Sequence, residues 1–393
     1  MKKLLHDAIR MEESFIAIRR QIHEAPETAY EEWKTTALIA EKLQSFGIEV
    51  MQDGNATGVV GVLRGARDGK TVALRADIDA LPVSEMSGLP YASKTQGKCH
   101  ACGHDLHTVA VLEAARLLSD RRDKLAGTVK FVFQPAEEQL NGAEAILERG
   151  LFQEADVIFG AHTWPELPVG TVGIQRGPMS AGADRFKITI HAAGGHAAHP
   201  EKTADPIIAA GYLITQLQMI VARELKATDA AVITVGKVSA GETYNTIPSE
   251  AVLEGTARYL SQEAHQRLQE SVKRMADCAA ESVGATATTE YYVACPLLKG
   301  TPDAVDTIER AAELVLGKEN IVALTEPSLG SEDFACYLQR MPGAYIRIGT
   351  ADERENSKLG LHNPALVFNE GAIAVGAATL CMAALLYTGS DME

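Results

Sequence analysis

The stretch Cys99-His100-Ala101-Cys102-Gly103-His104-Asp105-Leu106-His107 gathers two thiols, three imidazoles and a carboxylate into nine residues. Thiolate and imidazole are the ligands that divalent transition metals favour in proteins. An apolar run with helical spacing follows from Val109 to Leu118, so we expect the cluster on a loop that enters a helix. A polar turn with incidental cysteines, or a structural or redox zinc site on Cys99 and Cys102, is the plainer alternative. No second Cys-x-x-Cys follows, however, and the stretch favours a metal site that performs chemistry.

Composition and charge restrict the class of protein. The 393 residues suffice for two domains, and 46% hydrophobic and 23% charged residues are typical of a soluble globular enzyme. A formal charge of −15 argues against nucleic acid and anionic membrane surfaces as partners. The N-terminal segment has no apolar region of the signal-peptide kind, and six cysteines are too few for a disulfide scaffold, so we expect a cytoplasmic protein. The uncharged stretch 371–386 is too short for a membrane span and predicts a buried helix.

Strands alternate with helices along the first 181 residues. This order predicts an α/β domain with a mostly parallel, mixed sheet flanked by helices. In such sheets ligands bind outside the carboxyl ends of the strands. Acidic or imidazole side chains follow three predicted strands at that edge: Asp77 after 71–74, Glu137 and Glu138 after 127–133, and His162 after 155–160. The coincidence predicts one shared site.

The pattern changes near Gly182 and returns near Leu297. Between them the predicted order is strand, helix, strand, strand, helix, strand, which is the ferredoxin-like α+β unit. We therefore expect a discontinuous catalytic domain over 1–181 and 294–393. A smaller domain over 182–293 is inserted into it.

The metal ligands available near the predicted site are Cys102, His104, Glu138, His162 and His362. One catalytic ion uses about three protein ligands, so five ligands suit two ions that share the bridging thiolate of Cys102. We expect His104 and Glu138 to complete one ion, and His162 and His362 the other. Thiolate and imidazole favour zinc, whereas the carboxylate leaves manganese, cobalt or nickel open.

The doublet Glu137-Glu138 suggests a division of labour. Both side chains follow Pro135, where the strand has ended, so both can turn toward one cavity. Glu138 would bind metal, while Glu137 would take a proton from water and deliver it to a leaving nitrogen. The plain alternative is a solvated acidic pair at the start of a helix.

Four motifs occur in order along the chain: Arg75-Ala76-Asp77-Ile78-Asp79-Ala80-Leu81-Pro82, His100-Ala101-Cys102-Gly103-His104-Asp105, Gln134-Pro135-Ala136-Glu137-Glu138 and Leu361-His362-Asn363-Pro364. Together they resemble one family, the aminoacylase and hippurate hydrolase branch of the dinuclear metallopeptidases. That branch includes the plant auxin-conjugate amidohydrolases and the bacterial N-acetyldiaminopimelate deacetylases. The resemblance covers essentially the whole chain. It implies a two-metal hydrolase with an inserted lid that also dimerises, and it carries the metal roles onto the five ligands and the general base onto Glu137.

The resemblance also assigns residues in the lid. The segment 194–198 resembles the loop whose histidine, here His196, reaches the active site of the neighbouring subunit. The segments 245–248 and 255–258 resemble positions that hold the substrate carboxylate, which implicates Asn245 and Arg258. The guanidinium fork suits a carboxylate, although without the resemblance Arg258 would be taken for a surface strand residue.

Asp77 is expected to orient a metal ligand without binding metal itself, and the role of Asp79 is left open. His107 and His199 are kept out of the metal set. The sequence departs from the family at Cys99, which adds a second thiol, and at Leu106, which we expect to narrow the substrate pocket.

The sequence thus predicts a cytoplasmic N-acyl-L-amino-acid amidohydrolase. Two metal ions would activate water against the acyl carbonyl, His196 would stabilise the oxyanion, and the products would be a carboxylic acid and a free amino acid. The expected assembly is a homodimer or a tetramer, with a small N-acyl amino acid as substrate and with neither nucleic acid nor membrane as partner. The alternatives are a dipeptidase or carboxypeptidase of the same family, and a metal-binding member that has lost catalysis.

Overall fold

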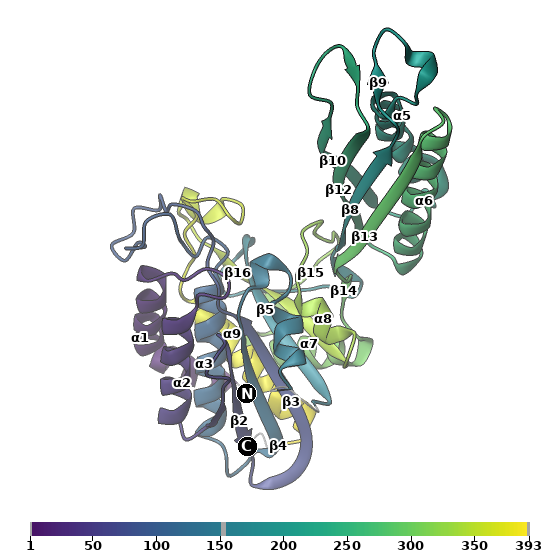
Figure 1. Cartoon of the computed structure of the whole chain (residues 1–393). Helices are drawn as coiled ribbons and strands as arrows, with labels where there is room; N and C mark the ends of the chain where they lie inside the picture. The colour runs from purple at the N-terminus through teal and green to yellow at the C-terminus, as the bar shows by residue number, and fades with distance from the viewer. Residues whose placement is uncertain (1, 151–154, 391–393) are drawn as a thin grey trace. The chain divides into compact units, whose positions relative to one another are not determined.

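The computed structural model of the chain describes residues 2–150 and 155–390 (Figure 1). These residues form two compact units. The first unit comprises Met1–Met179, Lys299–Glu326 and Asp333–Glu393, and the second comprises Ser180–Leu298 and Pro327–Glu332. Two short strands, β7 (Pro178–Ser180) and β14 (Leu298–Lys299), lie where the chain passes from one unit to the other.

The first unit is built on a mixed sheet. Within the described residues its strand order is β1-β2-β4-β3-β5-β16-β6-β15. The central strands β4, β3, β5 and β16 run parallel to one another, while β1, β2 and β6 join through antiparallel pairs. The predicted α/β fold with a mostly parallel mixed sheet is therefore confirmed. The strands are β1 (Glu49–Met51), β2 (Val59–Arg64), β3 (Arg67–Asp77), β4 (Ala126–Gln134), β5 (Val157–Pro168), β6 (Val172–Ile174), β15 (Ile321–Ala323) and β16 (Gly343–Ala351).

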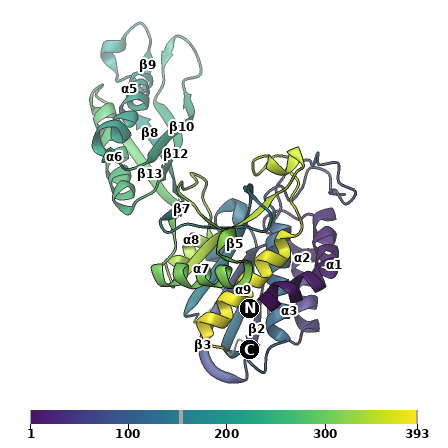
Figure 2. The same ribbon diagram turned by 180° about the vertical axis from the view of Figure 1, so that it is seen from behind.

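Helices cover this sheet. The helix α9 packs against α1, α3 and α7, and Figure 2 shows it beside them. The helix α9 carries no charge and is buried almost all round, as an apolar helix without a polar face must be, so the predicted buried C-terminal helix is confirmed. The helices are α1 (Lys2–Glu24), α2 (Trp33–Ser45), α3 (His104–Ser119), α4 (Gly142–Glu148), α7 (Pro302–Leu316), α8 (Phe334–Leu338) and α9 (Ala372–Thr388), with short turns η1 (Glu137–Gln139), η4 (Lys318–Asn320) and η5 (Glu355–Lys358).

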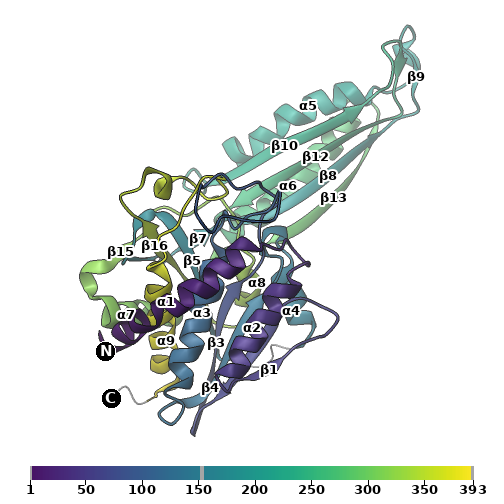
Figure 3. The same cartoon turned by 90° about the vertical axis from the view of Figure 1, so that its left-hand side faces the viewer.

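The second unit follows the predicted order of strands and helices. Its antiparallel sheet has the order β10-β12-β8-β13, with α5 and α6 packed against each other and against the strands (Figure 3). A separate two-stranded ladder joins β9 to β11. The elements are β8 (Gly182–His191), β9 (Gly195–His196), η2 (Pro200–Lys202), α5 (Pro206–Met219), η3 (Ile220–Glu224), β10 (Ala231–Ala240), β11 (Thr246–Ile247), β12 (Glu250–Tyr259), α6 (Gln262–Glu281) and β13 (Thr286–Cys295).

One helical stretch of the described residues, Pro206–Glu224, is long and apolar enough to cross a membrane by length and composition alone. The core helix of a soluble protein meets the same criteria. In this unit Asp205 caps the stretch by accepting hydrogen bonds from two backbone N–H groups, and Leu213 and Leu217 are buried in the core of the unit. The stretch packs, together with α6, against the sheet of the second unit.

The strand β5 is longer than the sequence predicts, and this difference affects the site. The predicted strand ends at Gly160, but β5 continues to Pro168 because β16 runs parallel to it and pairs Arg347 with His162 and Gly349 with Trp164. His162 therefore projects from within a strand. Asp77 and Gln134 do end their strands, as expected.

Candidate metal centre

The turn before α3 presents two of the predicted ligands. Gly103 precedes the helix with φ of 85°, a conformation that favours glycine. A Cβ atom at this position would lie 2.4 Å from the Oγ1 atom of Thr163, so no larger residue fits without a shift. The tight turn leaves Cys102 just before the helix and His104 as its first residue.

All five predicted ligands lie in the first unit, and their ligand atoms converge. Cys102 Sγ lies 3.5 Å from His162 Nε2, His104 Nε2 lies 3.8 Å from Glu138 Oε1, and that oxygen lies 3.3 Å from His362 Nε2. His104 Nε2 and Glu138 Oε1 are buried without a hydrogen-bond partner in the described part of the chain. Such atoms are costly unless a cation binds them, so the donor set fits bound divalent metal.

The convergent atoms form two groups that share Cys102. One group contains Cys102, His104 and His162, and the other contains Cys102, Glu138 and His362, with the ligand atoms of each group within 4.8 Å of one another. The sequence led us to pair His104 with Glu138 and His162 with His362. His104 also belongs to a convergent group with Glu137 and Glu138, so the distances between these side chains fit either division of the ligands between two ions.

Asp79 holds two of the ligands in place. Its Oδ1 atom accepts a hydrogen bond from His104 Nδ1 at 3.1 Å, and its Oδ2 atom accepts the backbone N–H of Glu138 at 3.0 Å. This contact leaves the Nε2 atom of His104 to face the cluster. Asp77, the residue predicted for this role, instead binds Arg75 at 2.7 Å and His107 at 2.6 Å and lies 3.9 Å from His104 Nε2.

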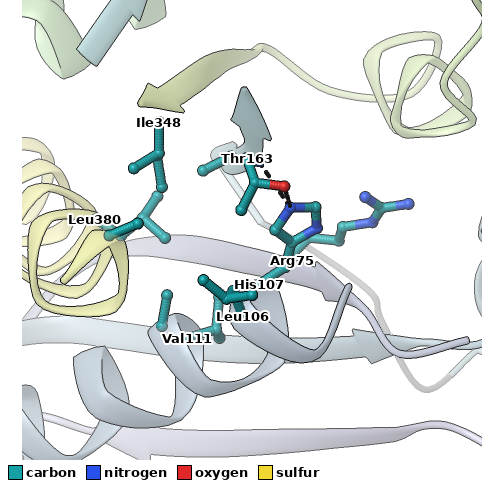
Figure 4. Close-up of a pocket in the computed structure, with 10 residues that line it drawn as sticks. Arg75, Leu106, His107, Val111, Thr163, Ile348 and Leu380 are labelled. Atoms are coloured by element: carbon teal, nitrogen blue, oxygen red, sulfur yellow. Dashed lines mark hydrogen bonds between the residues drawn. The ribbon is translucent and has the colours of Figure 1, made fainter. Parts of the chain in front are cut away.

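Both ring nitrogens of His107 are engaged away from the cluster. The Nδ1 atom lies 2.6 Å from Asp77 Oδ1, and the Nε2 atom accepts the backbone N–H of Thr163 at 2.8 Å (Figure 4). His107 therefore orients its neighbours rather than binding metal. Beside it lies an internal cavity, with room for about one water molecule, which is also lined by Leu106, Ile348 and Leu380. Leu106 lines this cavity, where we expected it to narrow the substrate pocket.

The side chain of Glu32 stabilises the turn that carries Glu137 and Glu138. Ala136 adopts a left-handed conformation with φ of 54°, and its N–H donates to Glu32 Oε1 at 3.0 Å. The hydroxyl of Thr57 donates to the other Glu32 oxygen at 2.8 Å. Burial raises the pKa of Glu32 to about 7 against the effect of these hydrogen bonds. Glu32 belongs to none of the recognised motifs, so the sequence offered no signal for it.

Burial and neighbouring charges shift the pKa values of His162, Cys102 and His104. Burial lowers the pKa of His162 well below its usual value, and the neighbouring His107 adds to this, so the ring is neutral and can bind a cation. Burial also raises the pKa of the Cys102 thiol, with Glu138 adding to the effect. Burial lowers the pKa of His104, but Asp77 and Cys102 outweigh it and raise the pKa well above the usual value. A bound cation would displace the protons of His104 and Cys102.

The predicted substrate residues lie in the second unit, at two ends of its sheet. The β9–β11 ladder pairs His196 with Thr246, and Ala197 N–H donates to the carbonyl of Asn245 at 3.1 Å, so His196 and Asn245 are neighbours. Arg258 pairs with Ala183 at the other end of β8. Its Nη1 atom donates to Ser331 Oγ at 2.9 Å, and that hydroxyl donates to the carbonyl of Ala181.

Comparisons with known proteins show which family and which solved structures the chain resembles. The model of peptidase family M20/M25/M40 matches residues 73–385. An N-acetylcysteine deacetylase of Bacillus subtilis is 41% identical over 361 residues, covering 92% of this chain and 93% of the relative. Thermostable carboxypeptidase 2 of Saccharolobus solfataricus is 36% identical over 392 residues, 99% of each chain. A solved dinuclear metal-binding peptidase of the M20 family from Bacillus subtilis matches with a TM-score of 0.85 and 37% identity, covering 97% of this chain and 99% of that one.

Proposed function

This chain belongs to peptidase family M20/M25/M40, and we propose that it is an N-acyl-L-amino-acid amidohydrolase with two divalent metal ions in each active site. The family match and the relatives confirm the resemblance inferred from the four motifs. They also confirm a metal-dependent hydrolase of the amidohydrolase kind. The deacetylase, which is named for an N-acyl amino acid, supports this substrate class.

The observation that carries the proposal is the convergence of five ligand side chains beside Glu137. Bound divalent ions would lower the pKa of a water molecule and polarise the acyl carbonyl. Glu137 is buried, and its Oε2 atom lies 4.0 Å from His104 Nε2, beside the cluster. In our proposal Glu137 takes the proton of the attacking water and delivers it to the nitrogen as the C–N bond breaks. Zinc or manganese suits this ligand set best, with cobalt and nickel as further candidates.

We further propose that Arg258 binds the α-carboxylate of the substrate. Ser331 accepts one N–H of its guanidinium and so fixes its direction. The remaining N–H groups form a planar fork that matches a carboxylate. Asn245 would contribute a hydrogen bond to the same group.

We also propose a homodimer in which the partner's His196 and the partner's Asn245 complete each site. In one chain Arg258 pairs with Ala183 while Glu250 pairs with His191, and the strand rises about 26 Å between those two positions. His196 follows beyond that far end, so Arg258 and His196 of one chain cannot hold the same small substrate. His196 Nδ1 accepts the N–H of Ala198 at 3.0 Å, which leaves its Nε2 atom to donate to an oxyanion.

Exposed apolar side chains support association through the second unit. Ile207, Ile208 and Tyr212 on α5 are each about half exposed, at 46%, 48% and 52%. Covering such a patch is favourable. We also propose a cytoplasmic location, as the six irregularly spaced cysteines of the sequence suggest.

A carboxypeptidase is the second candidate, and the relative from Saccharolobus solfataricus favours it. A substrate screen separates the two. Metal-stripped protein is reloaded with zinc, manganese, cobalt or nickel and assayed on N-acetyl amino acids, N-benzoyl amino acids and dipeptides. We expect fastest hydrolysis of the simple N-acyl amino acids and two ions per chain by elemental analysis. Hydrolysis of peptides alone would favour the carboxypeptidase, and no hydrolysis with any metal would indicate a non-catalytic member.

A further inference from the structure

Arg347 is a buried arginine whose role the proposed mechanism leaves open. It lies on β16 and is only 5% exposed. Its guanidinium carbon sits 3.6 Å from the ring centroid of Trp164, and its Nη2 atom donates to the carbonyl of Met179 at 3.2 Å. These are the side-chain contacts that the structure gives this guanidinium within the described residues. No carboxylate pairs with it there.

This environment is unusual for a buried cation. Buried guanidinium groups are costly unless a carboxylate pairs with them. Burial lowers the pKa of Arg347 to about 10, although Glu166 opposes the effect. The group therefore stays protonated at neutral pH. With one face on an aromatic ring and one N–H on a carbonyl, its remaining donors form a fork held in a defined direction.

Arg347 lies on the same face of the sheet as a metal ligand. The parallel register pairs Arg347 with His162, and paired residues of neighbouring strands project to the same face. Trp164, two residues after His162, also lies on this face, and the two rings are 6.3 Å apart. The Trp164 ring therefore stacks on the guanidinium and also lies next to the ring of His162, a proposed metal ligand.

We propose that Arg347, held flat by Trp164, binds a second carboxylate of the substrate beside the scissile amide. The enzyme would then prefer N-acyl amino acids that carry an acidic group besides the α-carboxylate, which we assign to Arg258. The second carboxylate belongs either to the amino-acid side chain or to a dicarboxylic acyl group. This inference rests on the proposed function. A purely structural arginine, tying β16 to Met179, would not distinguish charged from neutral substrates.

The test compares matched substrate pairs that differ only in charge. N-acetyl-L-glutamate against N-acetyl-L-glutamine tests the side chain, and N-succinyl-L-alanine against its succinyl half-amide tests the acyl group. In the wild type we expect kcat/KM to favour the acidic member of one pair by about 10-fold or more, as a charged bidentate contact implies. Arg347→Gln should abolish that preference and change neutral substrates by no more than about threefold. Arg347→Lys, which keeps the charge without the fork, should retain part of it.

Arg354→Gln is the matched control. Arg354 lies in the same unit, is paired with Asp352 on the surface, and its removal changes the net charge equally. We expect it to leave the preference intact. Equal losses on acidic and neutral substrates in the Arg347 variants would overturn the proposal. So would a selective loss on every free α-carboxylate relative to its amide, because Arg347 would then read the α-carboxylate.

A binding measurement keeps the test independent of turnover and of the proposed reaction. Calorimetry with the Glu137→Gln variant should show N-acetyl-L-glutamate or N-succinyl-L-alanine binding about 10-fold more tightly than its neutral partner, and adding Arg347→Lys should weaken that difference. Equal affinities in both pairs would overturn the carboxylate site. If the wild type hydrolyses no N-acyl amino acid, the proposed function fails, but the binding comparison still decides on Arg347.

Discussion

The two units of the chain hold their chemically important side chains in different ways. In the first unit the predicted ligands converge in a largely buried cluster, and Asp79 fixes both His104 and the backbone of Glu138. In the second unit His196 and Asn245 are exposed on the β9–β11 ladder, and the contacts between their segments are backbone hydrogen bonds.

The difference matches two kinds of task. A metal centre requires ligands within narrow distances, so a rigid surrounding shell stabilises it before any substrate arrives. If His196 and Asn245 act on a substrate held by the partner subunit, as we propose, they gain nothing from burial within their own chain. The comparison therefore predicts that changes in the buried cluster of the first unit act through metal content or proton transfer, whereas changes at His196 in the second unit act on the substrate held by the partner subunit.

The largest effect is expected at Glu137, with its neighbour as the contrast. Glu137→Gln should keep both metals and lower kcat by about 10²- to 10⁴-fold, because a carboxamide cannot shuttle the proton. Glu138→Gln should instead lower the metal content. Kinetics combined with elemental analysis of both variants measures this contrast. Near-normal turnover of Glu137→Gln would assign the base elsewhere.

His196 tests whether the second unit acts across subunits. His196→Ala should lower activity by about 10²- to 10³-fold as a homodimer, as loss of an oxyanion donor does. Mixed with Glu137→Gln and allowed to exchange subunits, it should recover roughly a quarter of wild-type activity, since about half the dimers are mixed and each has one intact site. Confirmed exchange without recovery would show that His196 serves its own chain.

Asp79 tests the rigid shell of the first unit. Asp79→Asn should weaken metal affinity by about 10- to 100-fold, because the carboxylate no longer holds His104 and the Glu138 backbone together. Asp77→Asn is the comparison, since Asp77 hydrogen-bonds with Arg75 and His107 and lies farther, at 3.9 Å, from the Nε2 atom of His104. Titration with a competing chelator measures both. A larger loss for Asp77→Asn would reverse the roles that the structure assigns.

The smallest effect on activity is expected at Glu113, which lies in the core of the first unit on α3. Its carboxylate is fully buried without a hydrogen-bond partner in the described ranges, and burial raises its pKa to about 8, with Glu12 adding to this. The unfolded chain releases this proton near pH 4.5, so the group destabilises the fold increasingly as pH rises from about 4.5 to 8. Glu113→Gln should remove this pH dependence, which is on the order of a few kcal/mol, and leave kcat unchanged.

Urea unfolding of the two proteins at pH 5 and pH 9 measures the effect. The variant should gain stability relative to the wild type only at the higher pH. An equal difference at both pH values would mean that the pKa of Glu113 is not raised in the folded chain, and would contradict this prediction.

Much of the fold was predictable because the secondary-structure elements follow from local patterns of apolar, polar and charged residues. The alternation of strands and helices predicts the sheet of the first unit, and the change of order near Gly182 predicts the smaller α+β unit. The absence of charge over 371–386 predicts a buried helix, since such a helix has no face for water. The predicted end of β5 was wrong. The length of this strand depends on its pairing with β16, which lies nearly two hundred residues away in the chain.

The residues of the candidate site also fall into those that the sequence predicts and those that it does not. Thiol, imidazole and carboxylate bind metal through their own chemistry, so Cys102, His104, Glu138, His162 and His362 could be proposed as ligands from the sequence alone. The hydrogen bonds of Asp79 to His104 and to the backbone of Glu138, and the support of Ala136 by Glu32, could not. These depend on which atoms of distant segments come within about 3 to 4 Å, and that is decided by strand register and backbone conformation. The sequence by itself determined which chemistry the chain carries. The tertiary structure alone decided which side chains orient the proposed metal ligands and the turn beside them.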